Sequence, residues 1–232
     1  MEIFMEYSEF VKEMRQRTDR LWSEIIRHPF VRGIGDGTLS KDRFEFYLKQ
    51  DYAYLIEFSR VFALAAAKAR NLADMTMFSD LLNATLKMEM ELHRRVCSDY
   101  GITNEQLEQT EPGLITTAYT KFLNYACYEG DLSDIMAVLL PCASGYVEIS
   151  EHLRSEGLPD QKHYRDWIET YSSDEMNDLV QWLIDKMNYF ARESSTEQRE
   201  HWFYLYQYSA RFELLFFEMG WTKEEWPPII PV

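Results

Sequence analysis

Apolar side chains recur every three or four positions along most of this chain, which is the spacing that puts them on one face of an α-helix. Phe10, Met14 and Leu21 follow this spacing near the start, and Phe44 and Phe58 belong to a longer ladder. No segment alternates with the period of two that is typical of strands. The pattern predicts helices over residues 5–27, 40–69, 74–100, 116–128, 133–157, 163–170, 172–192 and 196–219, with a short helix after Thr103.

Proline, glycine and capping residues predict where these helices begin and end. Pro29 pushes His28 toward extended geometry and ends the first helix. A loop is predicted at the glycines that follow. Later helices are predicted to begin at N-cap residues, whose side chains accept hydrogen bonds from backbone N–H groups. These boundary residues are Gly33, Gly35 and Gly37 in the loop, Ser40, Ser133, Thr103 with Gln106, and Ser172 with Glu175 as openings, and Gly101, Gly130, Gly157 and Gly220 as ends.

The composition favours an all-α fold. Glycine and proline are scarce, with 9 and 7 in 232 residues, while 15% of the residues are aromatic. Scarce turn formers indicate long regular elements, and abundant aromatic residues can fill a large core. Every gap between predicted helices is short, and we find no repeat or linker. We therefore expect a single helical domain over residues 1–232, with an irregular tail at 221–232 that contains three prolines.

The charge of the chain argues against several partners. A formal net charge of −15 repels phosphate, so we expect neither nucleic acid nor an anionic membrane as a partner. The first residues lack the features of a signal peptide, and no apolar run approaches the ~20 residues that cross a bilayer. Three scattered cysteines make no disulfide framework. These observations predict a cytoplasmic protein.

The segment Leu139-Leu140-Pro141-Cys142 carries the strongest chemical signal. A proline inside a helix lacks an N–H and clashes with the carbonyl one turn back, so it predicts a kink beside Cys142. Tyr146 lies one turn further along on the same face. A bend, a thiol and a phenol indicate a pocket. The alternative is a buried structural cysteine with a tyrosine packed beside it, since most free cysteines are inert.

Two carboxylates lie in apolar surroundings. Asp51 shares a helix face with Tyr54 and Phe58, and Glu213 is preceded by Phe212 and followed by Phe216. A carboxylate on a core face costs several kcal/mol unless it is paired. Either Asp51 binds something or its helix turns this face to water, and each carboxylate alone is also consistent with a structural role. Together they favour an enclosed polar pocket for an aromatic ligand.

A metal centre is not predicted. Di-iron bundles use Glu-x-x-His on two helices, and no histidine here has Glu three residues before it. Four histidines instead follow a glutamate by four residues, which suits a surface carboxylate–imidazole pair. These pairs are Glu24/His28, Glu89/His93, Glu148/His152 and Glu197/His201.

The same segments resemble the TenA/thiaminase II (TENA/THI-4) family, over nearly the whole chain and in the family's order. The resemblance implies a haem-oxygenase-like all-helical bundle. The matching segments are His28-Pro29-Phe30-Val31 with Gly37-Thr38-Leu39, Gln50-Asp51-Tyr52-x-Tyr54-Leu55, Leu139-Leu140-Pro141-Cys142 with Tyr146, Trp167-Ile168-x-Thr170-Tyr171, and Glu213-x-x-Phe216-Phe217.

The resemblance also implies a role for each site residue. Cys142 would be the nucleophile that adds to a pyrimidine ring, and Asp51 would hold the ring's amino group and the adjacent nitrogen. Glu213 would move protons to the leaving group, with a pKa that desolvation should raise. Four tyrosines would line the pocket and orient these groups, namely Tyr54, Tyr119, Tyr146 and Tyr171.

The implied reaction is hydrolysis at the methylene of the pyrimidine, in thiamine salvage. Aminomethylpyrimidine, or thiamine itself, would give hydroxymethylpyrimidine, with no metal or other cofactor, in a homotetramer of the family's cysteine-containing branch. The chain departs from the family pattern at two positions. Ser144 stands where a tryptophan is frequent, and Phe217 replaces the usual tryptophan of the last motif. Both departures bear on substrate preference.

A non-catalytic protein on the same scaffold is the alternative, either a binder of an aromatic metabolite or a regulatory partner of protein-degrading enzymes. The transcription-regulator label of some family members fits poorly with a net charge of −15. Cys142 discriminates between the two hypotheses, because a binder has no need of a reactive thiol.

Overall fold

The computed structural model describes residues 9–227, and every regular element in that range is a helix. The predicted all-α class is therefore confirmed. The chain divides into two compact units. Unit 1 comprises residues 1–39 and 129–214, and unit 2 comprises residues 40–128 and 215–232. The single domain over 1–232 stays a prediction.

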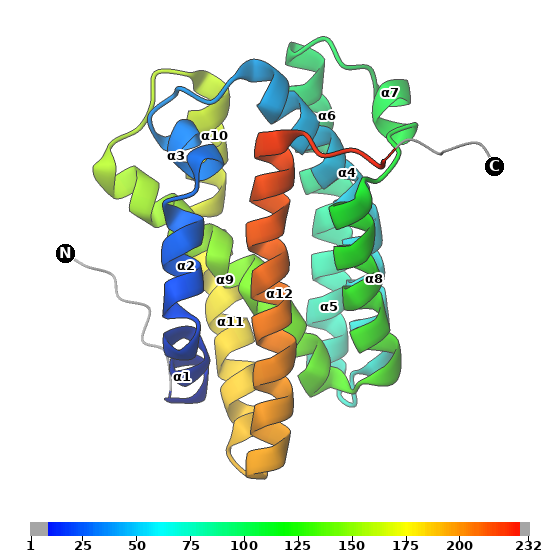
Figure 1. Ribbon diagram of the computed structural model, residues 1–232. Coiled ribbons are helices and arrows are strands. Elements are labelled where there is room, and N and C mark those ends of the chain that lie inside the picture. Colours follow the sequence, from blue (N-terminus) through cyan, green and yellow to red (C-terminus); the bar gives the residue numbers. More distant parts are fainter. Residues whose placement is uncertain (1–8, 228–232) are drawn as a thin grey trace. The chain divides into compact units, whose positions relative to one another are not determined.

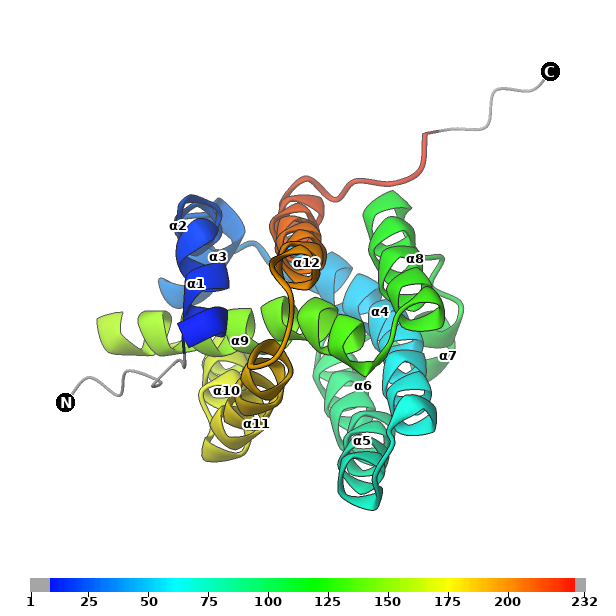
Figure 2. The same ribbon diagram turned by 90° about the horizontal axis from the view of Figure 1, so that it is seen from below.

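Unit 1 is built around helix α9, which carries Cys142. Figures 1 and 2 show α9 crossing between α1–α3 on one side and α10 and α11 on the other. The part of α12 that belongs to unit 1 contacts α9 through Ser209 and Val138. The helices are α1 (Glu9–Arg17), α2 (Asp19–Ile26), α3 (Pro29–Gly35), α9 (Leu132–Glu156), α10 (Lys162–Tyr171), α11 (Asp174–Ala191) and α12 (Thr196–Thr222).

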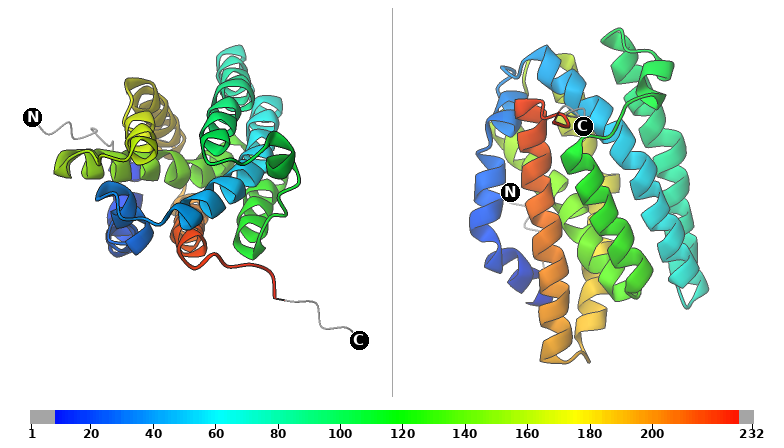
Figure 3. Two further views of the ribbon diagram at one scale, coloured as in Figure 1. Left: turned by 90° about the horizontal axis from the view of Figure 1, so that it is seen from above. Right: turned by 45° about the vertical axis from the view of Figure 1, so that its right-hand side comes forward.

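Unit 2 is built around helix α4, which carries Asp51. The continuous helical segment of α5, η1 and α6 packs on one side of α4 and α8 on the other, as Figures 2 and 3 both show. A single π-helical turn, η1, joins α5 to α6. The elements are α4 (Lys41–Lys68), α5 (Leu72–Ala84), η1 (Thr85–Glu89), α6 (Met90–Asp99), α7 (Asn104–Glu108) and α8 (Leu114–Glu129), with the last turns of α12.

The prediction of one helix over residues 5–27 is wrong at Thr18, and its first four residues lie outside the described range. The chain breaks there into α1 and α2. The Thr18 hydroxyl donates to the carbonyls of Met14 and Arg15 at 3.0 and 3.1 Å. A threonine hydroxyl that binds the preceding turn competes with regular helix geometry. Thr18 itself has φ −111° and ψ 12°, which is not helical.

The glycine-rich segment after Pro29 was expected to be a loop, and most of it is helix α3. Pro29 occupies the first turn of α3, where its missing N–H costs nothing. His28 is the N-cap, and its Nδ1 accepts the N–H of Phe30 at 3.2 Å. A side chain at Gly33 would press on the backbone of Leu39, 3.0 Å away. Close packing therefore explains this glycine better than turn chemistry does.

Several further helix boundaries differ from the sequence prediction by one to three residues. Helix α9 is opened by Asp131 and not by Ser133, because Asp131 forms a capping box with Asp134. Helix α11 is capped by Ser173 and not by Ser172. Helix α12 continues to Thr222, so the irregular tail begins two residues later than expected. The capping box of Thr103 and Gln106 is confirmed.

Helix α9 is long and apolar enough to meet the length and composition test for a membrane span, with 78% of the tested window buried inside the protein. The sequence alone predicts no such run. The helix is the core of unit 1, which accounts for its apolar composition. Such a helix is weak evidence for a membrane span, because buried core helices pass the same test.

A glycine on α9 lets α2 approach closely. Trp22 is buried in unit 1, and its ring lies so near Gly145 that an added Cβ would be 2.3 Å from the ring atom Cη2. No side chain fits there without moving the indole. Gly145 comes directly after Ser144, one of the two positions that depart from the family pattern. Packing against Trp22 therefore constrains which side chains this part of α9 can carry.

We predict that Gly145→Ala destabilises the protein. The added methyl group overpacks the core, which costs about 1–3 kcal/mol. Alanine has a better helix propensity than glycine by ~1 kcal/mol, so the substitution destabilises the protein clearly only if the packing cost lies in the upper part of that range. At 2.3 Å from a buried indole the cost should lie at that end. A lower melting temperature in calorimetry is the expected result. Gly113→Ala is the control, since its Cβ would meet atoms no closer than 3.4 Å; equal melting temperatures for both variants would contradict the packing argument.

Candidate functional site

Asp51 lies on the buried face of α4 and is paired with a histidine. Its residue surface is 6% exposed, and its Oδ2 is 2.6 Å from Nε2 of His93 on α6. Of the two alternatives left open by the sequence, exposure of this face to water is excluded. Among the described side chains, none contacts Oδ1, the other oxygen of the carboxylate, within hydrogen-bond distance. Asp51 therefore has one oxygen committed to His93 and one available to accept a hydrogen bond.

His93 was missed by the sequence analysis. The i, i+4 spacing of Glu89 and His93 was interpreted as a surface pair, and that interpretation is wrong because His93 is 6% exposed. Its Nδ1 bonds the backbone carbonyl of Glu89 at 3.1 Å. The surface-pair interpretation also fails for His28, which is the buried N-cap of α3. His152 and His201 pair with Glu156 and Asp134.

The environment of His93 favours its charged form. Burial alone would lower the pKa of His93, but the hydrogen bond and charge of Asp51, with the charge of Glu89, raise it above its ordinary 6.5. Burial raises the pKa of Glu89 to about 7, against the opposing charge of His93. The charge of Asp51 thus acts on both neighbours, because it raises the pKa of His93 and contributes to raising that of Glu89.

Tyr54 and Tyr119 meet in unit 2. Their ring centroids are 5.2 Å apart, and Tyr54 also packs edge-on against Phe216 at 5.6 Å. Tyr47 stacks on Phe217 with centroids 6.4 Å apart. The structure therefore places Asp51, Tyr54 and Tyr119 in the same unit, and the two phenylalanines of the last motif pack on its tyrosines. A tryptophan in place of Phe217 would need more room at a residue that is already fully buried.

Cys142 and two of the predicted tyrosines lie in unit 1. Tyr146 is one turn beyond Cys142 on α9, and its ring centroid is 4.7 Å from that of Tyr171 on α10. Trp167 completes the aromatic cluster, 5.6 Å from Tyr146 and 4.9 Å from Tyr171. Helix α9 continues through Pro141, and the Ser144 hydroxyl donates to the Leu140 carbonyl at 2.6 Å.

The three thiols differ in exposure. Cys97 and Cys127 are buried, whereas Cys142 is partly exposed, and none is in a disulfide. Burial raises the pKa of the Cys97 thiol to about 12, so that thiol stays protonated at neutral pH. Reactive cysteines are accessible ones that can reach the thiolate form. Exposure therefore favours Cys142 over the other two as a nucleophile.

Glu213 lies on the part of α12 that belongs to unit 1, and it is 2% exposed. One turn before it, the Ser209 hydroxyl donates to the carbonyl of Val138 at 2.8 Å. Val138 is itself one turn before Cys142 on α9, and both helices rise in the same sense in Figure 1. We therefore expect Glu213 and Cys142 on neighbouring turns of α12 and α9.

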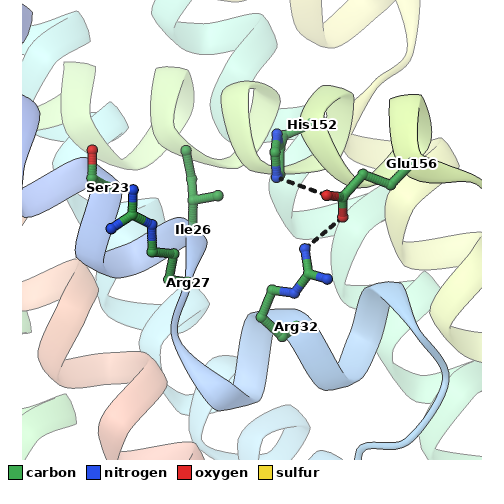
Figure 4. A pocket seen from close by; sticks show the side chains of 6 residues that line it. All are labelled: Ser23, Ile26, Arg27, Arg32, His152 and Glu156. Carbon is green, nitrogen blue, oxygen red and sulfur yellow. Dashed lines mark hydrogen bonds and ion pairs between the residues drawn. The ribbon is translucent and has the colours of Figure 1, made fainter.

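A surface pocket elsewhere in unit 1 holds none of the predicted site residues. Figure 4 shows Arg32 on α3 paired with Glu156 on α9, which also contacts His152 at 3.6 Å. These contacts fasten α3 to α9. The lining residues are Ser23, Ile26, Arg27, Arg32, His152 and Glu156. Among the side chains that the structure describes, no group of three His, Cys, Asp or Glu is placed to hold a metal ion.

Comparison with known proteins agrees with this fold. The model of the TENA/THI-4/PQQC family matches residues 15–223, and the chain belongs to that family. An aminopyrimidine aminohydrolase of Halalkalibacterium halodurans is 38% identical over 94% of this chain and 97% of its own length. An enzyme of the same name from Helicobacter pylori is 32% identical over 90% of this chain and 96% of its own length.

Solved structures confirm the haem-oxygenase-like fold. A protein from Silicibacter sp. TM1040, described as a TenA family transcription regulator, superposes with a TM-score of 0.86 at 33% identity, covering 93% of this chain and 98% of its own. A domain of unknown function with a heme oxygenase-like fold, from Shewanella denitrificans, gives a TM-score of 0.72 at 13% identity and covers 92% of each chain. The second likeness concerns the fold alone.

Proposed function

We propose that this protein is an aminopyrimidine aminohydrolase, or thiaminase II, that hydrolyses aminomethylpyrimidine or thiamine to hydroxymethylpyrimidine in thiamine salvage. The bacterial relatives of that name, at 38% and 32% identity over nearly the whole chain, support a hydrolase of this class. The structural observation that carries the proposal is the partly exposed Cys142 beside an aromatic cluster, in a chain whose other thiols are buried.

Cys142 is the proposed nucleophile. Its thiolate forms a bond to a ring carbon of the pyrimidine, and the displaced electron pair moves to a ring nitrogen, which takes up a proton. The loss of aromaticity allows the bond between the exocyclic methylene and the amine to break. Water then adds to the methylene, the ring nitrogen loses its proton, and the thiolate leaves with restoration of the aromatic ring. The net change is one water consumed and one amine released.

Glu213 is the proposed proton carrier. The departing amine needs a proton as its bond to carbon breaks, and the incoming water must lose one as it adds. One carboxyl group performs both tasks if it donates first and accepts afterwards. Support comes from its burial at 2% exposure and from the Ser209–Val138 contact one turn before Glu213 and Cys142.

Asp51 is the proposed acceptor for the 4-amino group and the neighbouring ring nitrogen of the substrate. Its free Oδ1 suits an N–H donor, and its buried setting strengthens each such hydrogen bond. The rings of Tyr54 and Tyr119 in unit 2, and of Tyr146 and Tyr171 in unit 1, are the proposed aromatic contacts of the ligand. We propose no metal or other cofactor in this reaction.

We also propose a homotetramer in the cytoplasm. Several tyrosines stay exposed, including Tyr125 at 67%, Tyr128 at 66% and Tyr189 at 61%, and this residue type is enriched at interfaces. The three thiols outside any disulfide suit a reducing compartment. Light scattering should give about four times the chain mass of 27.7 kDa, and a monomer mass at working concentration would refute the assembly.

We predict that Cys142→Ser abolishes turnover and leaves hydroxymethylpyrimidine binding intact. A serine hydroxyl is a far weaker nucleophile than a thiolate, so kcat should fall by roughly a thousandfold or more. Steady-state kinetics with aminomethylpyrimidine and with thiamine, beside calorimetric binding, make the measurement. Cys127→Ala is the control and should keep its rate. A Cys142→Ser enzyme near the wild-type rate would leave the non-catalytic binder as the better hypothesis.

We predict that Glu213→Gln lowers kcat much more than it weakens binding of hydroxymethylpyrimidine. Glutamine keeps the shape and one acceptor oxygen but cannot exchange a proton with the amine or with water. One limb of the pH–rate profile should disappear as well. The role changes to substrate binding if kcat and the profile are retained while affinity and kcat/KM fall together.

A further inference from the structure

We propose that His93 is a positioning residue: held as an imidazolium, it orients the Asp51 carboxylate so that Oδ1 can accept a hydrogen bond from the amino group of the substrate. The inference rests on the proposed function insofar as Asp51 binds the pyrimidine. The arrangement around His93 lies wholly within unit 2. It joins α4, the π turn η1 and α6 through two hydrogen bonds to one buried ring.

The partners of the two ring nitrogens determine where the protons lie. The backbone carbonyl of Glu89 can only accept, so Nδ1 of His93 carries a hydrogen. A second proton lies in the 2.6 Å contact between Nε2 and Oδ2 of Asp51. That proton resides on nitrogen in an ion pair or on oxygen in a neutral pair. The negative charges of Asp51 and Glu89 favour the first arrangement, and both raise the pKa of His93.

The π turn supplies a second, independent observation. Residues Thr85–Glu89 form the one π-helical segment in the described chain, directly before α6. Single π turns inside α-helices are rare and occur frequently at functional sites. The extra residue rotates α6 relative to α5 and so sets which of its faces meets α4. Here the face that meets α4 presents His93 to Asp51, 42 residues earlier in the chain.

The charged groups near this pair come from all three elements. Glu89, with a pKa raised to about 7 by burial, is a further acid whose charge acts on His93, and its side chain accepts a hydrogen bond from Thr85. Arg94 is turned to the hydroxyl of Tyr52 at 3.1 Å. On α4, Glu45 and Lys49 act with opposite signs on the neighbouring thiol Cys97. Among the described residues, the cationic side chain that contacts Asp51 directly is therefore His93.

Loss of the His93 proton should displace Asp51. Neutral His93 keeps its hydrogen on Nδ1, because the Glu89 carbonyl needs a donor. The lone pair of Nε2 then faces the lone pairs of Oδ2 at 2.6 Å, and the carboxylate must rotate away. The pKa of His93 is raised above 6.5, so the stabilisation is complete below 6.5 and is lost as the pH rises through the folded value. Substrate affinity should fall over the same range.

The first test needs no substrate. Nitrogen-15 NMR of histidine-labelled wild-type protein should show both ring nitrogens of His93 protonated near neutral pH, with the signal assigned by its absence in His93→Gln. Asp51→Asn should lower the pKa of His93, because the charge that raises it is gone. A His93 ring with one unprotonated nitrogen at neutral pH would overturn the inference.

The second test measures positioning. Calorimetry of hydroxymethylpyrimidine binding across pH should show wild-type affinity falling at the His93 pKa found by NMR. His93→Gln, which donates a hydrogen bond without a charge, should bind about tenfold more weakly at low pH and lose this pH dependence. Glu89→Gln should move the fall to lower pH, since it removes one of the charges that hold the proton on His93. His152→Gln, another histidine four residues after a glutamate, is the control and should match the wild type.

Each outcome separates the inference from the proposed function. Wild-type affinity and pH dependence in His93→Gln would overturn the positioning role. If His93→Gln fails to fold, the shift in Glu89→Gln decides, and an unmoved pH dependence there counts against the inference. If wild-type protein neither binds nor hydrolyses the pyrimidines, the proposed function fails, while NMR still decides the charge of His93 and its dependence on Asp51.

Discussion

A buried carboxylate sets the main constraint on unit 2. Asp51 lies on the inner face of α4, where an uncompensated charge would cost several kcal/mol. The hydrogen bond to His93 offsets that cost. His93 lies on α6, directly after the π turn η1. The pair fixes the register of α6 against α4, because a shift by one residue would leave both charges buried without partners. Much of the unit's apolar packing must therefore conform to one polar contact.

The fold was largely predictable from sequence, for a physical reason. Long helices with an apolar stripe repeat the same signal many times, so the errors lie at their ends. Thr18 breaks the first helix through hydrogen bonds from its own side chain, which periodicity does not register. The segment after Pro29 is a helix because its glycines serve close packing against Leu39 and Leu153, contacts that exist only once the chain has folded.

The candidate site was predictable only in part. Asp51 and Glu213 could be found because a charge within an apolar run is energetically anomalous wherever it folds. His93 could not be found in the same way, since its partner is 42 residues away and its local spacing matched a common surface pattern. The sequence did contain one indication of a buried pair. A histidine beside an apolar stripe is expected to be buried, and both of its ring nitrogens then need hydrogen-bond partners. The π turn that orients the His93 ring has no characteristic amino-acid composition, so the sequence does not reveal it.

The π turn has a consequence for how this sequence tolerates change in length. A π turn corresponds to one residue more than a continuous α-helix would need, so η1 is equivalent to a single-residue insertion between α5 and α6. Deleting one residue there would restore regular α-helical winding. It would also rotate α6 about the helix axis by about 100°, a quarter to a third of a turn. Relatives with a gap at this point of an alignment would have exchanged the face of α6 that meets α4. An alignment gap at η1 would therefore mark a relative in which the contact between α6 and α4 has changed.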